Sequence, residues 1–248
     1  VNPMSARLYE GDFTGSAILD ASGGQPRLHA KETLTGIQVG PLLEDVLGEA
    51  RLTGRGEVHA DLRMTGLSEE QIRRSLSGTS RVAFRDGALK GVNIAQIIRD
   101  ASAALGLSSS KFDTGTPGQT DFSELGASMI MTNGVIRNDD LYAKSPLLRI
   151  EGKGQVDLPK DTVDYRLTAE LVGSLAGQGG KGRDELLGIP IPVRVTGPLA
   201  DPDYQPDLEA LVRARAEAEF EKRRDEVQEK AEEQIRETLD GVLKGLFR

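Results

Sequence analysis

The stretch that decides the fold runs from Asn133 to Asp207, and it opens NGVIRNDDLYAKSPLLRIEGKGQVDLPKDTVDYRLTAELV. After a Gly-rich segment it closes with GIPIPVRVTGPLADPDYQPD. Apolar and β-branched runs alternate there with short stretches of Asn, Asp, Gly and Pro. These residues tolerate or fix turn geometry, so the short stretches predict tight turns. These turn sequences are Asn133-Gly134, Asn138-Asp139-Asp140 and Pro159-Lys160-Asp161. The stretch therefore predicts antiparallel strands joined by short turns.

Strand patterns continue toward the N-terminus. Residues 5–35 predict three short strands, with turns at Asp12–Gly15 and at Ser22–Pro26. Residues 51–66 alternate apolar and polar side chains, which is the period-2 pattern of a strand with one dry face and one wet face.

Two further strand predictions rest on turn and proline chemistry. The Asp86-Gly87 dipeptide predicts a hairpin that turns at that point. Pro190 and Pro192 lack N–H donors, so the segment around them predicts an edge strand that closes the sheet.

Helices are predicted between the strands. Residues 40–48 and 92–105 predict short helices, the second with apolar residues at helical spacing. Ser68 begins another, because its hydroxyl caps free N–H groups and Gln71 occupies the capping-box position. From about residue 206 the chain predicts one charged helix that continues to the C-terminus.

These patterns together predict a mainly β protein of the α+β class. We expect a long curved antiparallel sheet, or meander, with short inserted helices and a long C-terminal helix. The predicted division is a β-rich domain over residues 1–205 and a charged helix over residues 206–248. Segments 34–46 and 89–101 align without gaps, which indicates a repeated strand–helix unit unless Gly- and Leu-rich segments match by coincidence.

Composition excludes several classes of function. The net charge is −8 and no basic stripe is present, so a nucleic-acid partner is not expected. The chain has no cysteine, which excludes disulfides, thiol catalysis and cysteine metal sites. No apolar run reaches the length of about 18 residues that crosses a bilayer. The opening VNPMSARLYEGD is typical of an excised fragment, and we expect a membrane anchor upstream of it.

The sequence predicts no catalytic residue, no metal site and no cofactor. His29 and His59 lie on or near the wet phase of strands, where solvated histidines are ordinary. Turn chemistry explains Asp139-Asp140, and adjacent carboxylates on a strand point apart. The Gly-rich segment 173–185, predicted to be a surface loop, contains G-x-G-x-x-G but lacks the parallel βαβ unit that dinucleotide binding needs. An enzyme is therefore not expected.

One long pattern is specific enough to suggest a family. It comprises Thr120-Asp121-Phe122, Asp140-Leu141, Ser145-Pro146, Gly152, Gly154, Leu158 and the tail Ile191–Asp207. This pattern resembles the C-terminal region of the AsmA family, and the resemblance covers roughly residues 50–210. It implies an inner-membrane protein of Gram-negative bacteria, with one N-terminal anchor helix and most of the chain in the periplasm. It also implies a curved sheet with an apolar groove, phospholipid delivery to the outer membrane and a part in outer-membrane assembly.

A groove for acyl chains needs strands with one apolar face and one wet face, and adaptable Met side chains suit flexible tails. Candidate lipid-facing positions are Val58, Leu62, Met64, Val82, Phe84, Met129, Met131, Leu167 and Leu171. The alternative is that these side chains form an ordinary core under the helices.

The function that we expect is that of a non-enzymatic, periplasm-facing domain that contributes to phospholipid transfer and envelope assembly, with phospholipid acyl chains as its ligands. The alternative is a protein-interaction cap that docks an envelope partner without binding lipid. In the C-terminal helix, Ile235, Leu239, Val242 and Leu246 recur at coiled-coil-like spacing. This stripe predicts a partner-helix face that docks on the sheet or on another envelope protein, and the alternative is a solvated charged helix.

Overall fold

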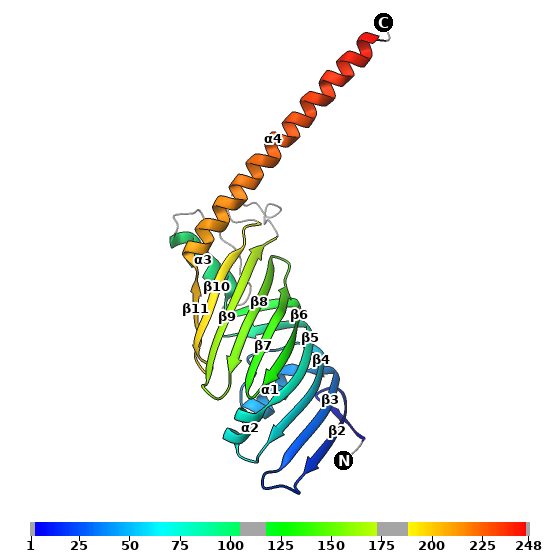
Figure 1. The fold of residues 1–248 in the computed structure, drawn as a ribbon, viewed down its shortest axis with the longest axis vertical. Coiled ribbons are helices and arrows are strands. Elements are labelled where there is room, and N and C mark those ends of the chain that lie inside the picture. Colours follow the sequence, from blue (N-terminus) through cyan, green and yellow to red (C-terminus); the bar gives the residue numbers. More distant parts are fainter. Residues whose placement is uncertain (1–2, 105–117, 173–187, 247–248) are drawn as a thin grey trace. The chain divides into compact units, whose positions relative to one another are not determined.

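The computed structural model describes residues 3–104, 118–172 and 188–246. It divides into two units, Val1–Leu208 and Glu209–Arg248. The first unit is built on an antiparallel sheet whose eleven strands lie side by side in sequence order (Figure 1). The predicted fold class is therefore confirmed: a curved antiparallel meander with short helices and a C-terminal helix.

The strands all pair with their sequence neighbours. They are β1 (Met4–Leu8), β2 (Gly11–Asp20), β3 (Arg27–Gln38), β4 (Arg55–Thr65), β5 (Ser77–Lys90), β6 (Gln119–Thr132), β7 (Val135–Lys144), β8 (Leu148–Asp157), β9 (Thr162–Leu171), β10 (Ile191–Pro198) and β11 (Asp203–Pro206). The helices are α1 (Val39–Leu47), α2 (Glu69–Ser75), α3 (Ile94–Ala104) and α4 (Leu208–Leu246). Within the described ranges, no helix combines the length and the apolar character that crossing a membrane requires.

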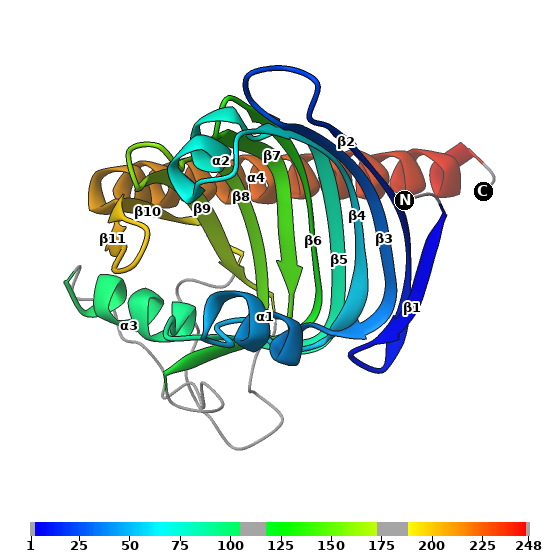
Figure 2. The same cartoon turned by 90° about the horizontal axis from the view of Figure 1, so that it is seen from below.

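The sheet is curved along its strands, and α1 and α2 lie on its concave side at opposite strand ends (Figure 2). Both 34–46 and 89–101 run from a strand end into a helix, α1 in the first case and α3 in the second. Helix α3 contacts β6 and β11. The Gly-rich segment 173–185 lies outside the described residues.

Three of the predicted turns are present. The Asn133-Gly134 pair joins β6 to β7, with φ of 49° and 80°, as a two-residue hairpin turn requires. Pro159-Lys160-Asp161 joins β8 to β9, and Ser22–Pro26 lies between β2 and β3. Gly134 has a second constraint: a Cβ there would lie 1.9 Å from the Arg73 carbonyl oxygen.

Two predicted turns near the N-terminal half are wrong. Residues Asp12–Gly15 pair within β2, and the turn lies instead at Tyr9-Glu10, where φ is 50° and 64°. Gly15 is needed because a Cβ there would approach the Lys31 carbonyl oxygen to 2.8 Å. The Asp86-Gly87 dipeptide makes no hairpin, since β5 continues through it and Gly87 lies against the Thr53 backbone.

Two predictions in the C-terminal half are also wrong. Asn138-Asp139-Asp140 is not a turn between strands but a β-bulge inside β7, where the pairing with β8 shifts between Asn138 and Leu141. Pro190 and Pro192 do not mark an edge, because β10 pairs with β9 on one side and with β11 on the other. The edges of the sheet are β1 and β11.

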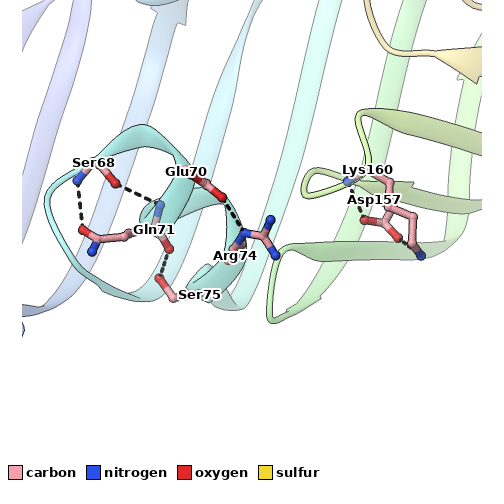
Figure 3. A network of polar contacts seen from close by, with 7 residues as sticks. All are labelled: Ser68, Glu70, Gln71, Arg74, Ser75, Asp157 and Lys160. Atoms are coloured by element: carbon pink, nitrogen blue, oxygen red, sulfur yellow. Dashed lines mark hydrogen bonds and ion pairs between the residues drawn. The ribbon is translucent and has the colours of Figure 1, made fainter.

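Helix α2 begins with the predicted capping box (Figure 3). The Gln71 N–H donates to Ser68 Oγ over 3.2 Å, and the Ser68 N–H donates to Gln71 Oε1 over 3.2 Å. Glu70 pairs with Arg74 one turn later at 3.1 Å. The Leu76 carbonyl, just past the helix, accepts from the Gly134 N–H, which ties α2 to the β6–β7 turn.

The cap yields a stability prediction. Ser68→Ala leaves helix N–H groups without their side-chain acceptor, and we expect it to lower the free energy of unfolding by about 1 kcal/mol. Urea unfolding followed by circular dichroism measures the change. Ser5→Ala on the exposed edge strand β1 is the matched control. Equal stability of the two variants would show that the capping box contributes nothing.

Candidate functional site

The two faces of the sheet differ in chemistry because cross-strand partners point to the same side. One continuous row runs from β3 to β10 through directly paired residues. It consists of Ile37, Gly56, Phe84, Leu125, Ala143, Ile150, Ala169 and Ile191. We call the side of the sheet that carries this row the apolar face, and the opposite side the polar face.

The predicted lipid-facing positions share the apolar face. Val58 pairs with Val82, Leu62 pairs with Gly78, and Met64 pairs with Leu28. Met129 pairs with Ser80 and Met131 with Gly78, while Leu167 and Leu171 continue the same face on β9. The register thus brings together residues that are distant in the sequence. Whether lipid contacts them stays a prediction.

Helix α1 shows which way the apolar face points. Val39 of α1 forms a buried cluster with Phe84 and Phe122, and Leu43 and Leu52 pack against this cluster. Because α1 lies on the concave side of the sheet, the apolar face is the concave one (Figure 2). Helix α1 therefore covers one end of the strands and leaves their middle uncovered.

Burial divides the apolar face into two parts. On β8 to β10 several of the side chains are buried, among them Ile150, Leu171 and Val193, and others, such as Val156, are half-buried. On β3 to β6, by contrast, most are only half-buried, including Val58, Leu62, Met64, Val82 and Met129. Of the remaining candidates, Phe84 and Met131 are buried and Leu167 is half-buried. The open part of the apolar face is therefore its N-terminal half.

The polar face carries the charged groups. Asp61 accepts a hydrogen bond from His29 at 2.7 Å and pairs with Lys31 at 3.3 Å, and these contacts lower its pKa. His59 lies beside Thr33 on the same face. Among the described residues, no three His, Asp or Glu side chains gather as a metal site would require. The groups on this face thus form surface pairs.

The sequence analysis missed a polar network on the apolar side of the β7 bulge. Asn138 is only 7% exposed, and its amide donates to the Ser128 carbonyl at 2.8 Å and to Asp140 at 2.7 Å. Its oxygen accepts from the Leu141 N–H and from the Tyr165 hydroxyl. The only signal in the sequence was Asn138-Asp139-Asp140, which also fits a turn. The network holds the bulge in a fixed geometry.

The predicted partner-helix face lies on α4. Ile235, Leu239, Val242 and Leu246 belong to this helix, but their side chains lie outside the described residues. Their role therefore stays a prediction.

Fold and face together define a class of protein: an open, curved, antiparallel sheet with an apolar concave surface. A family model described as the AsmA family matches residues 1–141, and the chain belongs to this family. The predicted resemblance is thus confirmed, and the match extends it to the N-terminal strands.

The chain is also similar to part of a longer bacterial protein. The chain is 24% identical over 215 residues to "Protein AsmA" of Escherichia coli (strain K12). The aligned region covers 86% of this chain and 34% of that protein, so the chain spans about a third of its relative. No solved structure matches.

The two parts of the apolar face predict different costs of truncation. Phe84 is buried beneath α1, so Phe84→Ala opens a cavity there, and we expect it to cost about 3–5 kcal/mol of unfolding free energy. Leu62→Ala acts on the open part, where little packing is lost, and we expect about 1 kcal/mol. Urea unfolding measures both. A loss at Leu62 as large as that at Phe84 would mean that the open part is packed like a core.

The Asn138 network predicts a pH dependence. Burial, with the charges of Asp140 and Asp139, raises the pKa of Tyr165 above its unfolded value of about 10. Tyr165 therefore contributes stability that is fully present below about pH 10 and is lost at higher pH. We expect Tyr165→Phe to cost about 1 kcal/mol at neutral pH and to reduce the loss of stability above about pH 10.

Unfolding by urea at neutral and alkaline pH tests this prediction. Tyr142→Phe, on the exposed polar face, is the control because it removes the same group outside the network. An alkaline loss as steep in Tyr165→Phe as in the unsubstituted chain would contradict the role given to Tyr165.

Proposed function

We propose that the apolar face shelters phospholipid acyl chains while their headgroups stay in water, and that the chain contributes in this way to lipid transfer between the membranes of the cell envelope. Membership of the AsmA family supports an envelope function. On this proposal the sheet faces the periplasm, belongs to a protein anchored in the inner membrane, and serves delivery of phospholipid to the outer membrane.

The observation that carries the proposal is the open part of the apolar face. Its side chains are aliphatic or Met, and they lie half-buried across β3 to β6 with no described helix over the middle of the strands. Burying an acyl chain there removes apolar surface from water on both sides, at about 0.8 kcal/mol for each buried methylene. This free energy depends on the buried apolar area and not on any single contact. A tail can therefore move along the face without first breaking a strong, specific interaction.

The backbone favours the same use. Each strand from β2 to β10 pairs on both sides, so its backbone hydrogen bonds are satisfied without a ligand. The sheet therefore keeps its curvature when it is empty, and loading costs little reorganisation. No catalytic step is part of this proposal, since holding and passing a tail requires no bond to be made or broken.

A second candidate function has one specific observation in its favour. Part of the apolar face on β8 to β10 is already covered by protein, as Leu171 and Ile191 show. A chain whose whole apolar face was filled would act as a cap that docks an envelope partner and binds no lipid. The half-buried face on β3 to β6 favours lipid binding over this alternative.

A pair of adjacent residues tests the proposal. Met129 lies on the apolar face, and Ile130 is 63% exposed on the polar face of the same strand. With a photo-reactive amino acid at Met129, we expect lipid adducts after ultraviolet irradiation of cells. The same group at Ile130 should give few, and Leu167 provides a second position on the apolar face. Adducts are detected by mass spectrometry of the purified protein.

The outcomes separate the two candidates. Lipid adducts at Met129 but not at Ile130 support the sheltered face. An absence of lipid adducts at both Met129 and Leu167, with protein adducts in their place, contradicts lipid binding and favours the cap.

A further inference from the structure

One charged side chain lies on the open part of the apolar face, across β3 to β6. Glu32 of β3 pairs with Ala60 of β4 and with Gly15 of β2, which places it in the same row as residues of the apolar face. Among the described positions of the open part on β3 to β6 that pair from Leu28 and Met64 to the row of Phe84, it is the only acidic or basic side chain on that face. Its position is near the middle of β3, away from both strand ends.

The neighbours of Glu32 leave space above it. Gly15, Ala60 and Ser80 occupy the same row on adjacent strands, and all three have small side chains. The Glu32 Cγ lies 3.5 Å from where a Cβ of Gly15 would be, so the Glu32 side chain extends beside the glycine. A hollow of about 820 Å³ lies along this row. Its lining consists of the residues of the row, from Met4 to Met129, and of their neighbours in each strand.

The carboxylate forms no ion pair with a cation among the described residues, whereas several acids of the polar face do form one. Asp61 on that face has both His29 and Lys31, and Glu124 has Lys144 at 2.9 Å. Glu32 is half-buried in apolar surroundings, where a charge without a partner is costly once water is displaced. An uncharged acyl chain that covered Glu32 would remove water from the carboxylate and give it no partner. A ligand with a positive charge would offset the lost hydration by pairing with the carboxylate.

The second polar group of the row points to the same ligand chemistry. Ser80 lies two strands from Glu32, which is about 10 Å between backbones. A carboxylate attracts an ammonium group, and a hydroxyl donates to a phosphate oxygen. Met4 and Met129 extend the row beyond these two polar groups on either side, and Met suits flexible apolar tails.

We propose that Glu32 and Ser80, which are both partly exposed in the hollow, form a headgroup site for an amphiphile that carries an ammonium group next to a phosphate. The headgroup stays in contact with water there, and Glu32 makes the open part of the apolar face selective for such lipids over anionic ones. This inference rests on the proposed function, since it names the class of lipid that the same face takes. Glu32 attracts the ammonium group of one lipid and repels a lipid with net negative charge. The same residue therefore favours binding of the first lipid and disfavours binding of the second.

The test uses two lipids that differ in their headgroups. The purified chain is incubated with vesicles of equal parts dioleoyl phosphatidylethanolamine and dioleoyl phosphatidylglycerol, separated from them, and its bound lipid is quantified by native mass spectrometry and extraction. We expect the unsubstituted chain to bind the ethanolamine lipid in excess. Glu32→Gln should lower the bound ratio by about threefold, as expected for a partly exposed ion pair.

Two further variants make the result specific. Glu32→Asp retains the negative charge on a side chain that is one methylene shorter, and we expect it to keep part of the preference for the ethanolamine lipid. Glu57→Gln removes a glutamate of the neighbouring strand β4 on the polar face, and we expect it to leave the ratio unchanged. Because Gln matches Glu in size and removes a charge from apolar surroundings, Glu32→Gln should fold as well as the unsubstituted chain.

Each other outcome overturns a distinct claim. An unchanged ratio in Glu32→Gln, with lipid still bound, contradicts the headgroup site and leaves the proposed function standing. If Glu32→Gln binds more of both lipids at an unchanged ratio, then Glu32 only disfavours binding of acyl chains in general. This result also contradicts the proposed headgroup site. Absence of lipid from the unsubstituted chain contradicts the proposed function, and the headgroup site with it.

Discussion

The structure depends on keeping side-chain alternation in phase across an eleven-stranded sheet. Each strand pairs only with its sequence neighbours, so a shift of one residue in any pairing moves every later apolar side chain to the polar face. The β-bulge in β7 is where this risk is greatest, because the strand shifts register against both β6 and β8. Asn138 and Tyr165 hold the bulge with buried hydrogen bonds, and beyond it the row from Phe84 to Ile191 stays on one side.

That continuity explains how one sheet contains both a core and an open surface. Toward the C-terminus the apolar face is buried and stabilises the fold, and toward the N-terminus it is only half-buried. Membership of the AsmA family supports an envelope function, and the proposal of lipid sheltering rests on the half-buried apolar side chains of β3 to β6. The unpaired carboxylate of Glu32 in that surface is difficult to explain by stability alone, and a cationic headgroup accounts for it.

Much of the fold was predictable because period-2 alternation and turn chemistry are local. The sequence analysis correctly predicted the Asn133-Gly134 hairpin, the Ser68 cap, and the apolar phase of β4 and β9. Its errors about turns share one physical cause, which is that Gly and Asx residues serve more than one purpose. Gly15 and Gly87 are required by close backbone approach, and Asn138 by a bulge, and all three had been interpreted as turns. Pairing partners decide between these uses, and they are distant in the sequence.

By itself the sequence determined the strand-rich class, the alternation of each strand, the absence of cysteine and the family resemblance, because these follow from local composition and spacing. Only the tertiary structure decided which alternating residues share one face, which part of that face is covered, and that Glu32 lies on the apolar side. The physical reason is that a face is defined by register between strands. Register is set by cross-strand hydrogen bonds and bulges, which no single segment specifies.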